Sequence, residues 1–453
     1  MRVVVVGAGP TGLFTASALA RRGHRVTVVD RDTGPRADGS WPRRGVMQFH
    51  HPHAFRAQVV EALQAELPEV WDKLLAAGAE PVAVPPGPEG SGGPEELMGV
   101  RCRRSTFERV LRAAAERQQG LILHPGHVDE VCAGRGRATG VRTDGATLDA
   151  DLVVAASGRA GRLGHHLRAP ARGGDCGIAY VSRQYRLRPG AQPGPMNFPL
   201  GQVDIYPGYQ SVVFPHDNGI FSTVIARGSD DRALAALRLP EVFDAAARVI
   251  PALAAWTDPT RADPHTPVLP GARLHNTYQG QLDETGAVPL PGLVFVGDAV
   301  CTTNPAVGRG IATSLLQARA LLRLLDEDPR DLVGLTLAFD AWCTDNIAPW
   351  FDDHVYWDAD LTRRWAGADV DLSRPLPSDL VVAATEADPG LFPLVGPYLS
   401  MRALPSSLDP ARPRATEIYA SGWRPRVPDG PTRDELADLV TRSAEATGAT
   451  PTS

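Results

Sequence analysis

Short apolar runs alternate with segments of helical character along much of the chain. Residues 3–6 and 26–29 are β-branched runs typical of buried parallel strands, and residues 13–22 between them have helical character. Two later apolar runs, at residues 152–156 and 293–296, resemble the first two. The pattern predicts an α/β protein built on a parallel sheet.

The middle of the chain has a different pattern. Between residues 179 and 226 it becomes β-rich, and its aromatic residues are separated by glycine and proline. This predicts an antiparallel sheet, inserted into the α/β pattern and suited to form a wall facing a substrate. The chain after residue 330 is helical and loop-rich, and a disordered tail is predicted for residues 443–453.

A glycine-rich turn joins the first predicted strand to the first predicted helix. Gly7, Gly9 and Gly12 form a G-x-G-x-x-G motif, and the second strand ends in Asp30. Such a turn lets the backbone approach a pyrophosphate at the helix N-terminus, and the acid can accept hydrogen bonds from a ribose. The alternative is an ordinary glycine-rich turn, but two flanking strands and a correctly spaced acid favour a dinucleotide-binding unit.

Composition excludes several other classes. The N-terminus superficially resembles a signal peptide, but the glycine motif interrupts its apolar core, so we expect a cytoplasmic protein. No run of about twenty apolar residues predicts a membrane span. The net charge of −6 gives no reason to expect nucleic-acid binding, and the 5 cysteines form no CxxC motif.

A second motif lies near residue 300. The strand at 293–296 ends in Gly297 and Asp298, and a loop containing Pro305, Gly308 and Gly310 leads into a helix. Asp298 can bind a polyol hydroxyl, and the free N–H groups of the helix start favour negative charge. A plain strand–loop–helix crossover would not require these residues.

Together these motifs resemble the FAD-dependent monooxygenases with the glutathione-reductase-like FAD fold, a superfamily that includes aromatic hydroxylases, squalene epoxidase and actinomycete polyether epoxidases. A third segment of that family matches residues 152–159, and Arg104 matches an arginine that often contacts the FAD phosphate or ribose. The resemblance implies non-covalent FAD bound by Gly7, Gly9, Gly12, Asp30, Arg31, Arg43, Arg104, Ser157, Gly158, Gly297, Asp298, Pro305, Gly308 and Gly310.

The resemblance also implies a domain organisation. We expect a Rossmann-like FAD-binding domain with an inserted antiparallel β-sheet substrate domain and a C-terminal helical region. The FAD-binding domain would comprise residues 1–175, with 60–98 partly on the substrate side, and residues 269–330. The substrate domain would span 176–268, and the helical region 331–442.

Residues 41–53 are expected beside the flavin. Arg43 or Arg44 would meet the FAD phosphate or the flavin face, so Arg43, Gln48 and His50 are the candidate catalytic residues. The histidines at positions 50, 51 and 53 have no matching carboxylate or cysteine nearby, and no metal site is expected.

The function implied by the resemblance is monooxygenation. Reduced FAD would react with O2 to give a flavin C4a-hydroperoxide, which hydroxylates or epoxidises a hydrophobic small molecule, plausibly in bacterial secondary metabolism. The first alternative is an FAD-dependent dehydrogenase, oxidase or ene-reductase of the geranylgeranyl-reductase type. The second is an FAD-binding protein without turnover.

One departure from the family pattern concerns the electron donor. Ala155 and Ala156 stand where many relatives carry an acid that engages both FAD and NAD(P)H. The donor is therefore left open between NADH, NADPH and a separate flavin reductase.

Overall fold

The computed structural model describes residues 1–43, 45–83 and 97–448. Its core is a five-stranded sheet in the order β19-β10-β1-β2-β6, in which all neighbouring strands are parallel. The strands are β1 (Arg2–Val6), β2 (Arg25–Asp30), β6 (Leu121–Pro125), β10 (Leu152–Ala155) and β19 (Leu293–Phe295). The parallel sheet predicted from the apolar runs is therefore present.

Helix α1 (Pro10–Arg21) packs against β1, β2 and β6. It also contacts α4 (Arg104–Ala115) and α7 (Gly310–Glu327). Because β1, β10 and β19 are parallel neighbours, the loops that follow them emerge at one edge of the sheet. The two glycine motifs and residues 156–158 therefore meet there, although they are distant in the sequence.

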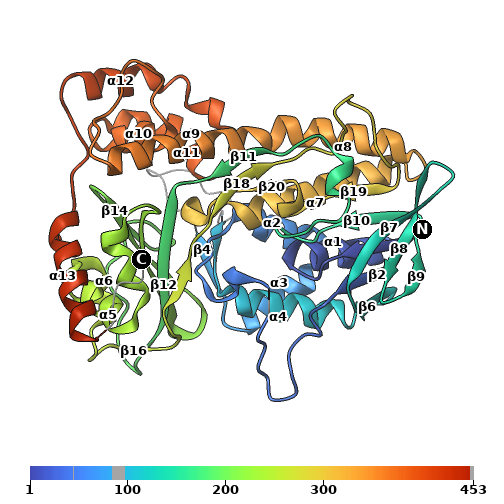
Figure 1. The fold of residues 1–453 in the computed structure, drawn as a ribbon, viewed down its shortest axis with the longest axis horizontal. Coiled ribbons are helices and arrows are strands. Elements are labelled where there is room, and N and C mark those ends of the chain that lie inside the picture. Colours follow the sequence, from blue (N-terminus) through green and yellow to red (C-terminus); the bar gives the residue numbers. More distant parts are fainter. Residues whose placement is uncertain (44, 84–96, 449–453) are drawn as a thin grey trace, which may run out of the picture.

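A second, antiparallel sheet lies beside the first (Figure 1). Its strands are β12 (Ile178–Leu187), β13 (Gln202–Tyr206), β14 (Tyr209–Pro215), β15 (Ile220–Gly228), β16 (Ala262–Pro264) and β17 (Leu269–Gly271). Alternate residues face opposite sides. One face, including Tyr209 and Phe221, packs on α5 (Pro240–Val249), α6 (Pro251–Thr257) and α13 (Arg433–Ala446). The other face lines a cavity.

The remaining elements surround these two sheets. Three small sheets contain β3 (Phe55–Arg56), β4 (Glu80–Ala83) and β5 (Leu97–Arg101); β7 (Val128–Gly134), β8 (Arg137–Thr143) and β9 (Ala146–Asp149); and β11 (Arg172–Asp175), β18 (His275–Tyr278) and β20 (Cys301–Thr302). The other helices are α2 (Ala57–Glu66), α3 (Pro68–Ala76), α8 (Leu332–Asn346), α9 (Ala348–Trp365), α10 (Ser378–Ala383), α11 (Phe392–Leu399) and α12 (Arg412–Ala420).

The tail prediction is wrong for residues 443–446. Helix α13 runs to Ala446, while residues 449–453 lie outside the described residues. Thr432 and Glu435 form a capping box that starts the helix, and Leu436 and Val440 are buried in the core of the antiparallel sheet. The helix forms because its apolar face packs against this core. This packing cannot be recognised from the local composition.

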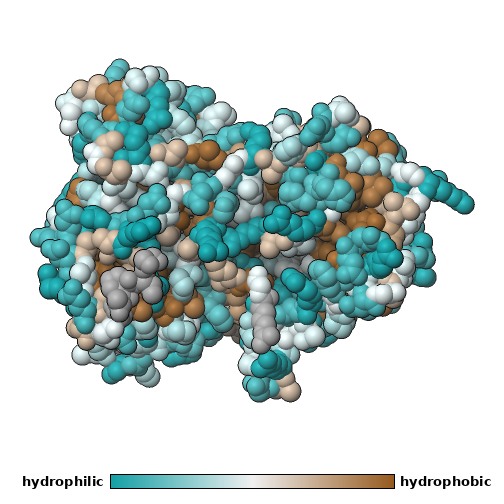
Figure 2. Space-filling model, in the orientation of Figure 1, coloured by the Kyte–Doolittle hydropathy of each residue, from teal (hydrophilic) through white to brown (hydrophobic). Residues whose placement is uncertain are grey.

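One face of the molecule is mostly polar. Hydrophilic residues cover most of the face shown in Figure 2, with smaller hydrophobic patches between them. In the part of the chain that the structure describes, we find no helix that is both long enough and apolar enough to span a bilayer.

Candidate functional site

One large cavity, of about 1460 Å³, lies between the edge of the parallel sheet and the antiparallel sheet. Its lining comes from the loops after β1, β2, β10 and β19 and from strands β12, β14 and β15. Most residues singled out from the sequence line this cavity. They are Gly7, Gly9, Asp30, Arg31, Arg43, Gln48, Arg104, Ser157, Gly158, Asp298, Pro305, Gly308 and Gly310. Gly12, His50 and Gly297 are not part of the lining.

The glycines after β1 serve different purposes. A Cβ on Gly7 would lie 2.4 Å from the Ala156 oxygen, and one on Gly12 would lie 1.9 Å from the Gly7 oxygen. Both glycines are thus required by the packing of the chain itself. A Cβ on Gly9 would meet nothing within 4 Å. Gly9 instead keeps space open in front of the α1 N-terminus, where a pyrophosphate fits.

Asp30 is fixed at the end of β2 with its carboxylate facing the cavity. The backbone N–H of Ala8 donates to one carboxylate oxygen at 2.6 Å, and that of Asp32 donates to the other at 2.8 Å. The side chain nevertheless remains 21% exposed. It can therefore accept further hydrogen bonds from the hydroxyls of a ribose, as FAD requires.

Arg43 lies next to Asp30 and is fixed by several contacts. Its Nε donates to Glu108 at 3.0 Å, its Nη2 donates to the Ala8 oxygen at 2.8 Å, and its Nη1 lies 3.7 Å from Asp30. Only 2% of its side chain is exposed. We propose that Arg43 supports Asp30 rather than acting on substrate; its neighbour Arg44 lies outside the described residues.

Glu108 takes part in ion pairs rather than in a helix cap. Residues 105–108 read as a capping box in the sequence, yet α4 begins at Arg104 without any side-chain cap. The Glu108 carboxylate instead accepts from Arg43 and, at 2.5 Å, from Arg104 Nε. It is fully buried between these two guanidinium groups.

Asp298 lines the cavity. Burial raises the pKa of Asp298, whereas the positive charges of Arg104 and Arg159 lower it. A carboxylate in this position can accept a hydroxyl hydrogen bond from a polyol such as the ribityl chain. Gly297 does not reach the cavity; its φ of 72° favours glycine, and its N–H donates to Gln317 Oε1 at 2.9 Å.

The loop between β20 and α7 forms the next part of the lining. Thr302, Asn304 and Pro305 face the cavity, as do Gly308 and Gly310. A Cβ on Gly308 would lie 2.7 Å from the Ala54 Cβ, whereas one on Gly310 would meet nothing within 4 Å. As at Gly9, the space at Gly310 lies at the start of a helix, where free N–H groups favour negative charge.

The three histidines near residue 50 have separate roles. His51 Nδ1 lies 2.7 Å from Ser182 Oγ, and burial lowers the pKa of His51 to about 4. His53 Nε2 lies 3.2 Å from Arg104 Nη1. The His50 ring packs against Phe49 outside the cavity lining. Among the residues that the structure describes, no group of three or more His, Cys, Asp or Glu is placed to hold a metal.

Tyr180 is a site residue that sequence reasoning missed. It lines the cavity and is 7% exposed, and its hydroxyl has no hydrogen-bond partner within the described residues. A Cβ on Gly271 would lie 2.4 Å from Tyr180 Cζ, so the glycine leaves room for the ring. The sequence placed Tyr180 on a strand, but it could not show which face the strand presents to the cavity.

Comparisons with known proteins identify a matching family and a similar fold. The model of the FAD dependent oxidoreductase family matches residues 2–87, which contain the first glycine motif and Asp30. The menaquinone reductase of Mycolicibacterium smegmatis is 29% identical over 355 residues, which are 76% of this chain and 79% of that protein.

Two solved structures have a similar fold. PqsL of Pseudomonas aeruginosa, described as a probable FAD-dependent monooxygenase, matches with a TM-score of 0.59 at 17% identity, over 81% of this chain and 98% of its own. A triple mutant of the flavin-dependent brominase Bmp2 matches with a TM-score of 0.60 at 14% identity, over 99% of both chains. The chain has the fold that these two flavin-dependent proteins share. The fold class and the superfamily resemblance expected from the motifs are thereby confirmed, and family and fold together support an FAD-dependent oxidoreductase.

Proposed function

We propose that this protein is an FAD-dependent monooxygenase that inserts one oxygen atom from O2 into a hydrophobic small molecule. The observation that carries the proposal is the continuity of the cavity. The same 1460 Å³ space is lined by Gly9, Asp30 and Asp298, which suit FAD, and by the inner face of the antiparallel sheet. A substrate held against that face would lie next to the cofactor.

The sheet face provides a mostly apolar wall with two polar side chains, Tyr180 and Gln210. Val212, Phe214 and Val224 contribute apolar side chains, which would bind a hydrophobic substrate and exclude water. The unpartnered Tyr180 hydroxyl can hydrogen-bond to an oxygen of the substrate and orient it. Bound FAD in its reduced form would supply the electrons that activate O2, so the chain needs to position substrate and exclude solvent.

A second candidate function is reduction of a carbon–carbon double bond. It is favoured by one observation, the similarity to a protein named menaquinone reductase. The same cavity would suit an isoprenoid or quinone substrate, because its wall is apolar and its volume is large. The two functions differ in the fate of O2, which makes them separable by experiment.

Isotope labelling is expected to show that O2 supplies the atom added to substrate. The FAD-loaded protein, reduced anaerobically, would be mixed separately with 2-naphthol and with a menaquinone carrying a short isoprenyl chain, and labelled O2 would then be admitted. We expect mass spectrometry to detect label in a hydroxylated or epoxidised product. Gain of two hydrogens on the isoprenyl chain of the menaquinone, without label, would establish the reductase instead, and a variant unable to bind FAD serves as the blank.

The electron donor is expected to be a separate flavin reductase. Ala155 is fully buried in β10, and neither Ala155 nor Ala156 offers a carboxylate to a nicotinamide cofactor. NADH or NADPH alone should therefore reduce the bound FAD slowly, whereas an added flavin reductase should restore fast reduction.

Anaerobic stopped-flow measurement of the flavin absorbance band tests this expectation. Ala155→Asp is an uninformative variant, because its charge would be buried in the sheet. The useful control is a reductase without nicotinamide, which should leave the band unchanged. Rapid bleaching by either nicotinamide alone would contradict the two-component proposal while leaving the monooxygenase proposal intact.

A further inference from the structure

The loop that lines the cavity between β20 and α7 is fixed by a helix from the C-terminal part of the chain. Asn304, on this loop, is 2% exposed. Its backbone N–H donates to Asn276 Oδ1 at 2.7 Å, and its side-chain oxygen accepts from the Ala306 N–H at 2.9 Å. Its side-chain nitrogen donates to Asp358 Oδ2 on α9. Every polar group of the Asn304 side chain is thus used to hold the loop.

Asp358 joins the loop to a second element as well. Its Oδ2 also accepts from Asn276 Nδ2 on β18, at 2.5 Å, and the residue is only 5% exposed. A single buried carboxylate therefore receives hydrogen bonds from two amides on different parts of the chain. Because Asn304 itself lines the cavity, the carboxylate is one residue removed from the space that suits FAD.

Further contacts hold the same loop from the same side. Arg309 Nη1 donates to Asp353 on α9 at 2.8 Å, and Arg56 Nη2 donates to the Val307 oxygen at 2.6 Å. These contacts lie at and beyond the turn at Gly308. Asn276 and Asp358 instead act on Asn304, in the part of the loop that leads from β20, and Asp358 is the acceptor for the Asn304 side-chain nitrogen.

We propose that Asp358 is a positioning residue, which in its ionised form holds the loop at residues 302–310 in the conformation that binds FAD. The proposal rests on FAD binding in this cavity and does not depend on which reaction follows. A protonated carboxyl is a weaker acceptor than a carboxylate, so the two amide contacts weaken when Asp358 gains a proton. FAD affinity should then depend on the protonation of this one residue.

The surroundings of Asp358 place this titration near neutral pH. Burial raises the pKa of Asp358 to about 7, although the Asn276 and Asn304 amides lower it. The carboxylates of Asp379 on α10 and Asp353 on α9 raise it further. The other ionisable groups close to this network are Arg309, His354 and the Cys176 thiol, and burial lowers the pKa of His354 to about 3, so it stays neutral.

The direction of the pH effect follows from linkage. The ionised carboxylate favours the FAD-binding loop conformation, so FAD affinity should rise as pH increases through about 7. The stability of the folded chain should change in the opposite direction at this residue, because a carboxyl whose pKa is raised by folding costs stability as pH rises from about 4, where it ionises in the unfolded chain, to about 7. A gain in FAD affinity with pH would therefore not reflect a gain in stability.

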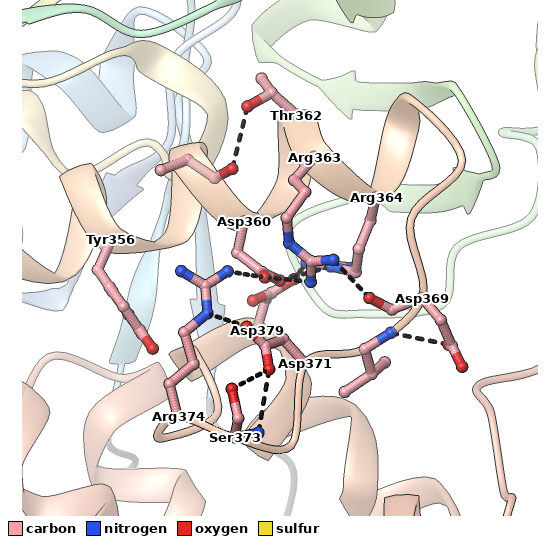
Figure 3. Close-up of polar contacts among 12 residues, drawn as sticks. Tyr356, Asp360, Thr362, Arg363, Arg364, Asp369, Asp371, Ser373, Arg374 and Asp379 are labelled. Carbon is pink, nitrogen blue, oxygen red and sulfur yellow. Dashed lines mark hydrogen bonds and ion pairs between the residues drawn. The ribbon is translucent and has the colours of Figure 1, made fainter.

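Asp360 offers a matched control on the same helix. It is 1% exposed and accepts from Arg363 at 2.8 Å, Arg364 at 2.7 Å and Arg374 at 2.9 Å. Figure 3 shows this arginine cluster around Asp360, with Asp379 close by. Neither Asp360 nor these arginines line the cavity. Asp360→Asn therefore perturbs a buried carboxylate of α9 without touching the loop.

The test is a titration of FAD-free protein with FAD, followed by flavin fluorescence, at pH values on either side of 7. The affinity of the wild-type protein for FAD is expected to rise about tenfold across this interval. A change of this magnitude corresponds to the contribution of about one charge-assisted hydrogen bond. Asp358→Asn should bind FAD with a weak affinity that is independent of pH, and Asn304→Ala should behave in the same way. Asp360→Asn should keep the wild-type pH dependence.

Three results would overturn the proposal. The first is a wild-type affinity that does not change with pH, and the second is a pH dependence that persists in both Asp358→Asn and Asn304→Ala. The third is an equal loss of pH dependence in Asp360→Asn. Circular dichroism establishes that each variant is folded, and failure of wild type to bind any FAD would refute the cofactor assignment rather than the role of Asp358.

Discussion

Gly9→Val is expected to abolish FAD binding in a chain that still folds. The residue is in extended backbone, with φ −77° and ψ 179°, which valine readily adopts. No atom of the described chain lies within 4 Å of the position its Cβ would take. The branched side chain would instead fill the space where the pyrophosphate fits. We expect FAD affinity to fall by more than about 100-fold.

Fluorescence titration with FAD and thermal unfolding of the FAD-free protein measure the two effects separately. The unfolding free energy should change by about 1 kcal/mol or less, because only the N-cap position of α1 is altered. Gly12→Val is the contrasting variant, since its side chain would collide with the Gly7 oxygen, and it should prevent folding. A Gly9→Val protein that retains bound FAD would show that the cofactor does not use this turn.

Asp217→Ala should lower the unfolding free energy by about 3–5 kcal/mol, the loss typical of breaking a buried ion pair. Asp217 follows β14, and its side chain is fully buried. It accepts from the Arg103 backbone at 2.6 Å, from Arg103 Nη2 at 2.6 Å and from Thr106 Oγ1 at 2.9 Å. The variant would leave these donors without an acceptor where α4 meets the antiparallel sheet.

Urea unfolding of FAD-free protein measures this loss. Asp263→Ala is a suitable control, because its pair with Arg188 is exposed and screened by solvent, so its loss should have little effect on stability. Burial alone would raise the pKa of Asp217, but the hydrogen bonds and charge of Arg103 lower it below the usual value. Its stabilising effect should therefore be complete at neutral pH and lost on strong acidification. Equal effects of the two substitutions would contradict this account.

The parts of the site that could be predicted from sequence are local. Gly7, Gly9 and Gly12 act within one turn, and Asp298 directly follows its strand, so spacing along the chain reveals them. Arg43 could be placed near the cofactor but not oriented, because its partner Glu108 lies 65 residues away. The local pattern of residues 105–108 is typical of a capping box, so it favours a helix cap for Glu108 and gives no sign of the contact with Arg43.

Asp358 could not be predicted for a related reason. It has no motif around it, and its partners Asn276 and Asn304 come from β18 and from the loop after β20. Only the folded arrangement of α9 against this loop brings the three side chains together. Helix α13 could not be predicted for the same reason, because its apolar residues are buried only by packing against the antiparallel sheet.

The position of α13 also has a consequence for the order in which the protein matures. The antiparallel sheet is synthesised by the ribosome long before residues 433–446, yet Leu436 and Val440 form part of its core. Tyr206 and Tyr209 also donate their hydroxyls to the backbone oxygens of Asp429 and Pro431, just before this helix. The core of the antiparallel sheet therefore stays incompletely covered until residues 433–446 leave the ribosome. A nonsense mutation before Arg433 would leave the dinucleotide motifs intact while removing part of the support for the substrate wall.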